Sequence, residues 1–168
     1  MLKELIPEEA IQQRVRELGK LISADYEGRE ILMVVLLRGS FIFSADLIRV
    51  LEPETIVDFM VVSSYEGETS SGEVRILKDL AENVHDRDVL IVEDIVDTGL
   101  TLNKILQLLE SRNPKSVAIC SMLNKPCRRL QPVDIQYIGF EVEDRFVVGY
   151  GLDYNQKYRQ LPFIGEIV

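Results

Sequence analysis

The residues with the clearest chemistry lie in one stretch, Asp88 to Thr101, where aliphatic residues give way to acids and then to hydroxyl groups. Val89 to Val92 is an unbroken aliphatic run rich in β-branched residues, as expected for a strand buried on both faces. Asp97-Thr98-Gly99 follows a few residues later, and leucines and isoleucines at helical spacing come after Thr101. The stretch therefore predicts a strand, a short polar loop and a helix N-terminus.

The side chains of this loop favour a sugar phosphate as ligand. Thr98, Gly99 and Thr101 provide hydroxyls and backbone N–H groups at a helix start, where the helix dipole attracts an anion such as phosphate. Glu93 and Asp94 have the wrong sign for phosphate but suit Mg²⁺ or ribose hydroxyls. The ligand end of the strand is its carboxyl end, because open α/β sheets bind ligands there.

A P-loop nucleotide hydrolase also places acids at a strand end, but it needs a Gly-x-x-x-x-Gly-Lys-Ser/Thr loop. The chain has one Gly-Lys pair, Gly19-Lys20, which is followed by Leu21 and has no glycine five residues before it. The sequence therefore excludes this class.

The run Val-Leu-Ile-Val-Glu-Asp-Ile-Val-Asp-Thr-Gly-Leu-Thr is similar to the phosphoribosyl-pyrophosphate motif of the type I phosphoribosyltransferases. It resembles most closely the purine branch that salvages hypoxanthine and guanine. The resemblance implies transfer of the 5-phosphoribosyl group from phosphoribosyl pyrophosphate to hypoxanthine or guanine, giving IMP or GMP and pyrophosphate, with Mg²⁺ as cofactor. It also implies the family's α/β fold, a central mostly parallel sheet flanked by helices with a small hood.

Roles within the motif follow from the same resemblance. Asp97 to Thr101 would hold the 5′-phosphate, and Leu100 stands where some relatives carry Lys. Asp97 would also be the general base near the imidazole nitrogens of the purine. The substrate-binding residues implied here are Glu93, Asp94, Ile95, Asp97, Thr98, Gly99, Leu100 and Thr101.

A second aliphatic run, Ile31 to Leu37, ends in Arg38-Gly39-Ser40 before another helical pattern. A basic residue, a glycine and a serine at such a junction suit an anion. The segment resembles the family's pyrophosphate loop, with Leu37, Arg38 and Gly39 in contact with the leaving group and a cis peptide between Leu37 and Arg38. The family often has Lys at the Arg38 position.

Ten residues rich in Ser, Gly, Glu and Thr, 63–72, follow a predicted strand over 55–62. Their composition favours a connection without a core of its own. In the family the matching loop closes over the site, and the resemblance assigns its Ser-Tyr pair to Ser64 and Tyr65. Such a lid would protect a cationic sugar transition state from water.

The C-terminal third contains the residues that the resemblance assigns to the base and the leaving group. Lys125, after a strand over 116–123, would donate a hydrogen bond to the oxygen at purine position 6 and so select 6-oxopurines over adenine. Phe146 would stack on the base, and the backbone of Val147 would read its edge. Asp153 would join Glu93 and Asp94 as a metal-associated carboxylate, and Arg159 would contact pyrophosphate.

The bulk properties set the remaining expectations. The 168 residues suit one doubly wound domain, 1–168, with the hood built from the N-terminal segment and roughly residues 125–168. The net charge of −9 argues against nucleic acid, and no stretch approaches a membrane span. We expect reduced cysteines, a cytoplasmic location and, from the family, a homodimer or homotetramer. Preference among hypoxanthine, guanine and xanthine stays open, and an RNA-binding regulator with this fold is the alternative from another class.

Overall fold

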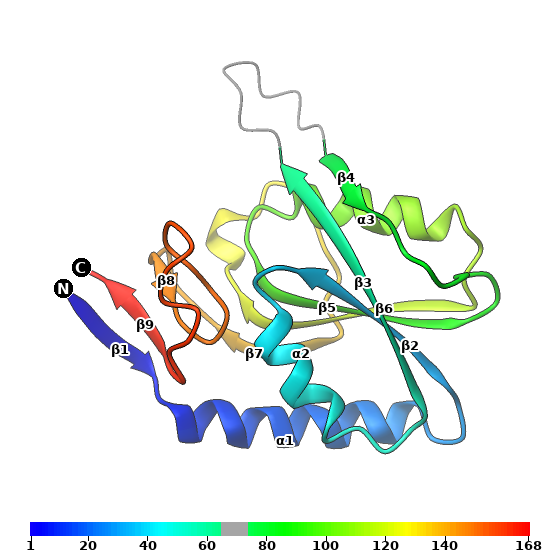
Figure 1. The fold of residues 1–168 in the computed structure, drawn as a ribbon, viewed down its shortest axis with the longest axis horizontal. Coiled ribbons are helices and arrows are strands. Elements are labelled where there is room, and N and C mark those ends of the chain that lie inside the picture. The colour runs from blue at the N-terminus through cyan, green and yellow to red at the C-terminus, as the bar shows by residue number, and fades with distance from the viewer. Residues whose placement is uncertain (65–73) are drawn as a thin grey trace.

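The computed structural model describes residues 1–64 and 74–168 (Figure 1). Its main sheet has six strands in the order β4-β3-β2-β5-β6-β7 within the described residues. Neighbouring strands are parallel except for the β3–β4 pair. The predicted central, mostly parallel sheet is therefore confirmed. Its strands are β2 (Ile31–Leu37), β3 (Thr55–Ser64), β4 (Val74–Lys78), β5 (Asp88–Val96), β6 (Ser116–Asn124) and β7 (Tyr137–Glu141).

Helices cover both faces of this sheet (Figure 1). Helices α1 (Glu8–Asp25) and α2 (Phe41–Ile48) pack on one face, whereas α3 (Leu100–Glu110) packs on the other. Alternate residues of β2 and β5 face these two cores, so both strands need apolar side chains on each side. This burial explains why their sequences are continuous aliphatic runs and not alternating ones.

The hood is a second sheet in which β9 (Ile164–Ile167) pairs antiparallel with β1 (Leu2–Ile6) and with β8 (Val147–Val148). The hood is narrower than the 125–168 range expected from the sequence. Strand β7 joins β6 in the main sheet, and the short 3₁₀ helix η1 (Pro126–Arg128) leads towards it. This pairing covers the edge of β6, whose backbone groups would otherwise lack partners.

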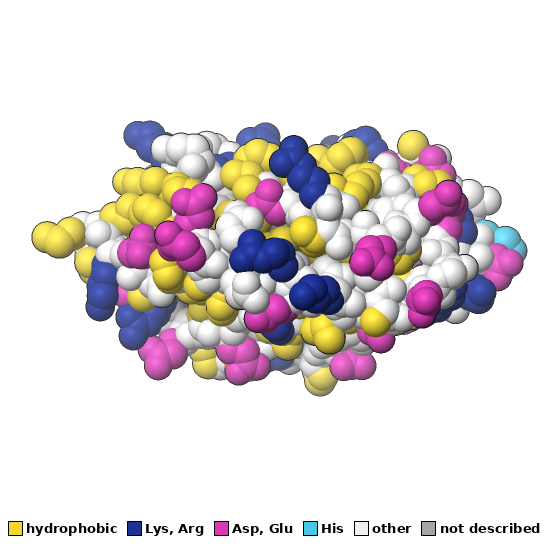
Figure 2. Space-filling model, turned by 90° about the horizontal axis from the view of Figure 1, so that it is seen from below, with side chains coloured by type: hydrophobic (Ala, Val, Ile, Leu, Met, Phe, Trp, Pro, Cys, Tyr) yellow, Lys and Arg dark blue, Asp and Glu magenta, His cyan; other side chains and the backbone are white. Residues whose placement is uncertain are grey.

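No helix of the described residues is long and apolar enough to cross a membrane. Acidic and basic side chains are interspersed over the face shown in Figure 2, without a continuous basic patch. An RNA-binding regulator would need such a patch, and this face does not provide one.

Asp58 of β3 is a buried carboxylate that holds the connection between β4 and β5. Its Oδ2 accepts hydrogen bonds from the backbone N–H groups of Ala81 and Glu82, both at 2.8 Å, and its Oδ1 accepts from that of Phe59. Burial by itself raises the pKa of Asp58, but these donors and nearby Lys78 outweigh burial and lower the pKa below its usual value. The ionised carboxylate therefore stabilises the folded state at pH values above the ordinary pKa of an aspartate.

We expect Asp58→Asn to lower the free energy of unfolding by about 1–3 kcal/mol at pH 7, because the amide keeps a single, uncharged acceptor oxygen for the three backbone N–H groups of Phe59, Ala81 and Glu82. A lowered native pKa means that the contribution of Asp58 is lost as the pH falls through that pKa. The difference between the two proteins should therefore shrink below about pH 4. Urea unfolding of both proteins between pH 3 and 8 measures it, and a pH-independent difference would contradict the assignment.

Candidate active site

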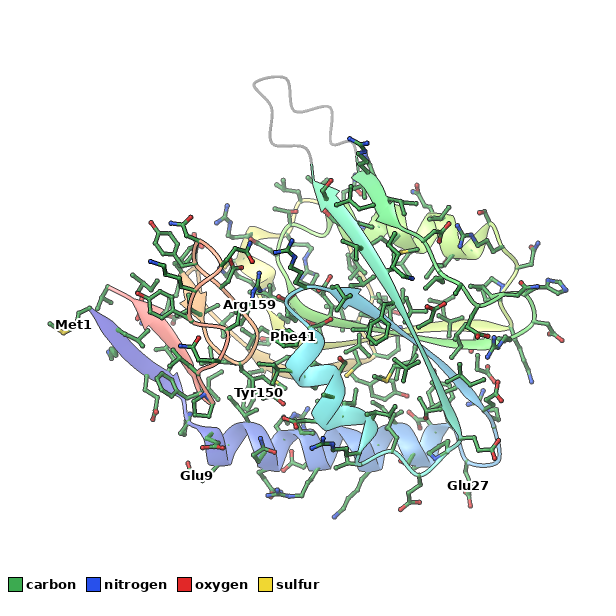
Figure 3. The ribbon with its side chains drawn as sticks, in the orientation of Figure 1. Met1, Glu9, Glu27, Phe41, Tyr150 and Arg159 are labelled. Atoms are coloured by element: carbon green, nitrogen blue, oxygen red, sulfur yellow. The ribbon has the colours of Figure 1, made fainter. Side chains whose placement is uncertain are left out.

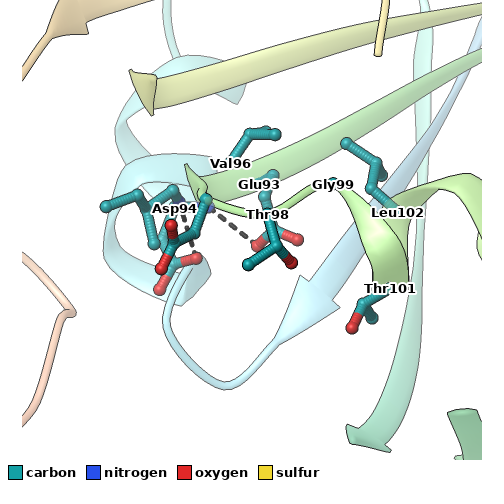
Figure 4. A pocket seen from close by; sticks show the side chains of 9 residues that line it. Glu93, Asp94, Val96, Thr98, Gly99, Thr101 and Leu102 are labelled. Carbon is teal, nitrogen blue, oxygen red and sulfur yellow. Dashed lines mark hydrogen bonds between the residues drawn. The ribbon is translucent and has the colours of Figure 1, made fainter. Parts of the chain in front are cut away.

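The phosphate-type loop lies between the end of β5 and the start of α3. Gly99 directly precedes α3. Its φ of +82° is a left-handed conformation that favours glycine. A Cβ at this position would lie 2.6 Å from the carbonyl oxygen of Gln131, so space also requires glycine. Residues 93–99, Thr101 and Leu102 line a pocket of about 200 Å³ here (Figure 4). The sequence prediction of a strand, a polar loop and a helix start is confirmed.

The loop leaves hydrogen-bond donors available for an anion. Within residues 1–64 and 74–168, no acceptor is recorded for the backbone N–H groups of Thr98, Gly99 and Thr101. The carbonyl oxygen of Thr98 is already engaged, because it accepts hydrogen bonds from the N–H groups of Leu130 and Gln131. Free N–H groups and two hydroxyls at the start of an eleven-residue helix form a site with the polarity that phosphate needs.

Two adjacent carboxylates form the acidic side of the pocket. Glu93 Oε1 accepts a hydrogen bond from the backbone N–H of Asp94 at 3.0 Å, and Asp94 Oδ1 accepts from that of Ile95 at 2.7 Å. Burial and the neighbouring charge of Asp94 raise the pKa of Glu93 well above its usual range. Two carboxylates held so close favour a proton or a cation between them.

This donor set fits Mg²⁺. The described residues contain no group of three or more His, Cys, Asp or Glu side chains placed to hold a metal ion. Mg²⁺ is ordinarily bound through one or two carboxylates together with substrate oxygens and water, and Glu93 and Asp94 match that pattern. The predicted trio of Glu93, Asp94 and Asp153 does not form a single cluster.

The pyrophosphate-type loop packs directly against the acidic pair. The peptide between Leu37 and Arg38 is cis, as the resemblance implied. A Cβ on Gly39 would lie 1.7 Å from Asp94 Oδ2, and a Cβ on Gly151 would lie 2.2 Å from the carbonyl oxygen of Gly39. Gly39 is therefore enclosed between β5 and the hood, and glycine at both positions allows three segments distant in the sequence to meet.

Asp97 is held by its main chain while its carboxylate stays available. The Nε of Arg129 donates to the carbonyl oxygen of Asp97 at 2.9 Å, and its guanidinium also contacts Asn124 Oδ1 of β6. Asp97 Oδ1 is buried without a hydrogen-bond partner in the described residues, although Arg128 Nε lies 3.5 Å away. A positioned carboxylate oxygen that lacks a donor is suited to accept a proton.

The predicted base-recognition residues lie beside this loop. The backbone N–H of Lys125 donates to the carbonyl oxygen of Val96, so the end of β6 is attached to the end of β5. The side chain of Lys125 is 7% exposed, and its Nζ donates to the carbonyl oxygen of Arg145 at 2.7 Å. Phe146 follows Arg145 and is 54% exposed, and the ring of Tyr154 packs edge-on against it at 5.5 Å. An exposed aromatic face and a buried ammonium thus occur together.

Asp153 and Arg159 form an ion pair next to Gly151. Asp153 Oδ1 lies 3.2 Å from Arg159 Nη2, and Arg159 Nη1 donates to the carbonyl oxygen of Gly151 at 2.7 Å. Figure 3 shows Arg159 near the start of α2, the helix that follows the Gly39 loop. Arg159 therefore lies where a leaving group at that loop would need positive charge.

The remaining predicted residues have different outcomes. Ile95 lines the pocket, whereas Leu100 begins α3 and does not line it. Val147 is 7% exposed and pairs with Glu166 of β9, and its contact with the base stays a prediction. Ser64 ends β3, and Tyr65 and the predicted lid over 63–72 lie almost wholly outside the described residues.

Sequence reasoning missed Arg129, Gly151 and Gln156. Arg129 belongs to a basic run after Lys125, and nothing in its type distinguishes it from a surface charge. Gly151 lies in a Gly-Tyr-Gly sequence, which was a usable signal for an unusual backbone, and all three of these residues have positive φ. Gln156 accepts hydrogen bonds from both Arg38 and Arg159, a contact that no local pattern indicates.

Comparisons with known proteins agree with this geometry. Residues 1–155 match the model of the phosphoribosyl transferase domain. The chain is 50% identical over 167 residues to the hypoxanthine phosphoribosyltransferase of Escherichia coli, covering 98% of this chain and 94% of the relative. It is 48% identical to the hypoxanthine-guanine phosphoribosyltransferase of Staphylococcus epidermidis, covering 97% and 92%. A crystal structure of a hypoxanthine-guanine phosphoribosyltransferase from Bacillus anthracis superposes with a TM-score of 0.95 at 43% identity, covering 98% of each chain.

Proposed function

The chain belongs to the phosphoribosyl transferase domain family, and we propose that it is a purine-salvage enzyme. It transfers the 5-phosphoribosyl group from phosphoribosyl pyrophosphate to hypoxanthine or guanine and releases IMP or GMP together with pyrophosphate. The relatives at about half identity over nearly the whole chain carry this activity in their names. The reaction makes the enzyme a glycosyltransferase that acts on a pentosyl group.

One observation carries the proposal. The hydrogen bond from the Lys125 N–H to the Val96 carbonyl joins the base-recognition segment to the phosphate loop. Asp97 then lies between the two, with a buried carboxylate oxygen that accepts no hydrogen bond from residues 1–64 or 74–168. A sugar phosphate in the loop and a flat base beside Lys125 would therefore have their reacting atoms next to the same carboxylate.

The reaction breaks the bond from ribose C1 to the pyrophosphate oxygen and forms a bond from C1 to a purine nitrogen. Positive charge develops on the ribose ring, so catalysis depends chiefly on positioning and electrostatics. Asp97 accepts the proton that the purine imidazole loses. The positive charges of Arg38 and Arg159 stabilise the negative charge of the departing pyrophosphate. When bound by Glu93 and Asp94, Mg²⁺ would neutralise pyrophosphate and orient the ribose hydroxyls.

The direct test is the stoichiometry of the products. Purified protein given hypoxanthine, phosphoribosyl pyrophosphate and Mg²⁺ should form IMP and pyrophosphate in equal amounts, and chelation of the metal with EDTA should stop the reaction. Chromatographic quantification of both products measures this. Release of pyrophosphate without nucleotide would instead indicate hydrolysis of the donor.

Lys125 supplies a prediction on specificity. Lys125→Ala should lower kcat/KM for hypoxanthine and guanine by about 100-fold, because it removes a buried donor to the 6-oxo group. Adenine turnover should change little, so the preference for 6-oxopurines should fall. Initial rates with the three bases measure this, with Lys20→Ala on the exposed face of α1 as a control. Unchanged selectivity would remove Lys125 from base recognition.

Further parts of the proposal rest on the family resemblance. We assign residues 1–168 to one domain, the enzyme to the cytoplasm and the assembly to a homodimer or homotetramer. Phe41 and Phe59, 43% and 40% exposed, lie on the α2 side of the sheet edge and support self-association. Light scattering on a sizing column distinguishes monomer, dimer and tetramer.

A further inference from the structure

A tight turn in the hood places one neutral side chain between two arginines. Tyr154 and Lys157 exchange backbone hydrogen bonds at 3.1 and 3.0 Å, so that Asn155 and Gln156 are the two central residues of the turn. Both have positive φ, +49° and +64°, as in the type I′ turns that connect paired strands.

Gln156 is an unfavourable choice for this position. The second central residue of such a turn is most often glycine, because a residue with a Cβ rarely adopts a left-handed conformation. Asn155 tolerates the conformation better, as asparagine commonly does. A non-glycine residue held at positive φ in a functional segment suggests that its side chain is needed there.

The contacts of the Gln156 side chain identify that need. Its Oε1 accepts a hydrogen bond from Arg38 Nη1 at 3.1 Å and another from Arg159 Nη2 at 2.9 Å. Arg38 belongs to the cis-peptide loop before α2, and Arg159 follows the turn, so this single oxygen connects the two segments. Asp153 Oδ2 fixes the turn by accepting from the backbone N–H of Gln156 at 2.8 Å.

The charges of Arg38 and Arg159 explain why a neutral hydrogen-bond acceptor, the amide of Gln156, is useful between them. Two guanidinium groups repel each other, and a shared acceptor offsets that repulsion without cancelling their charge. Asp153 already pairs with Arg159 at 3.2 Å. The side chains of Arg38, Arg159 and Asp153 together therefore carry one net positive charge. A carboxylate in place of the amide would remove that remaining charge.

We propose that Gln156 is a positioning residue that presents Arg38 and Arg159 together to the pyrophosphate group. The inference rests on the proposed function, which makes pyrophosphate the leaving group. Arginines in fixed orientation suit two oxygens of a polyphosphate, because guanidinium donors bind such groups in pairs. Gln156 itself does not contact the reacting atoms.

The test uses variants in which the turn and the side chain have opposite requirements. Gln156→Gly in the full chain suits the positive φ but removes the acceptor. We expect an unchanged or higher Tm together with a Kd for magnesium pyrophosphate raised about tenfold, by titration calorimetry. Asn155→Gly is the matched control and should leave that Kd unchanged. The KM for hypoxanthine should stay within about twofold in both variants, since the base site is separate.

Gln156→Glu separates positioning from simple support of the turn. A carboxylate would accept from both arginines more strongly, so a purely structural role predicts normal pyrophosphate affinity. The positioning role predicts weaker affinity because the net charge is lost. A Kd within twofold of the parent in either Gln156→Gly or Gln156→Glu would overturn the inference. Calorimetry reports this without turnover, so absent purine turnover with normal pyrophosphate binding would count against the proposed function alone.

Discussion

Asp97→Ala should lower kcat by about 10²- to 10⁴-fold, the range expected when a positioned general base is removed. Binding of phosphoribosyl pyrophosphate should weaken only a few-fold, because the loop is held through main-chain groups. Arg129 donates to the carbonyl oxygen of Asp97, and a substitution of the side chain leaves that contact in place. The loss should therefore appear in kcat and not in the affinity for phosphoribosyl pyrophosphate, the phosphoribosyl donor.

Steady-state rates and calorimetric titration of the donor measure these two quantities. Asp97→Asn keeps the shape of the side chain but cannot accept a proton in the same way, so it should resemble Asp97→Ala. Asp134→Ala, an exposed aspartate beyond η1, serves as the control and should leave both quantities unchanged. Near-normal kcat in Asp97→Asn would remove Asp97 from proton transfer.

Gly39→Ala should also lower activity strongly, and the cause is steric. The added Cβ would lie 1.7 Å from Asp94 Oδ2, and the loop has no room to retreat because the carbonyl oxygen of Gly39 packs against Gly151. Either the Asp94 carboxylate or the arginine-bearing loop must move. A displacement of about 1 Å at a catalytic site can cost about 100-fold in rate, and we expect a loss of kcat/KM for the donor of that order.

Gly28→Ala provides the matched control. Gly28 lies in the turn before β2 with φ of +72°, and a Cβ there would meet nothing within 4 Å. This variant should lower the stability of the fold somewhat, because alanine is unfavourable at positive φ, while kcat/KM for phosphoribosyl pyrophosphate stays unchanged. Initial rates over a range of donor concentrations and thermal unfolding of both variants make the comparison. Donor kcat/KM in Gly39→Ala within threefold of the parent would contradict the close packing of the three segments.

The central part of the fold could be predicted because its sequence signals are local. The aliphatic runs of β2 and β5 reflect burial on both faces, and the Asp-Thr-Gly sequence marks the helix start at which the pocket forms. The acidic pair lies near the carboxyl end of β5, and the basic glycine loop and Lys125 follow β2 and β6, which are parallel to β5 in the same sheet. Their approach at one edge follows from that topology.

The hood and the contacts across the site could not be predicted in this way. Strand β1 pairs with β9 at the opposite end of the chain, and no local pattern specifies that partner. The contact between Gly39 and Gly151 and the hydrogen bonds of Arg129 depend on how distant segments pack. The resemblance implied a metal role for Asp153, and no local pattern indicates that its two carboxylate oxygens contact Arg159 and the backbone N–H of Gln156.

The measurement that tests the central claim most directly is turnover of four bases in parallel. Hypoxanthine, guanine, xanthine and adenine are each supplied with phosphoribosyl pyrophosphate and Mg²⁺, and nucleotide formation is followed. We predict rapid formation of IMP, GMP or both and little product from adenine. Equal use of adenine would contradict the role of Lys125, and no product from any base while the donor still binds would contradict the proposed reaction.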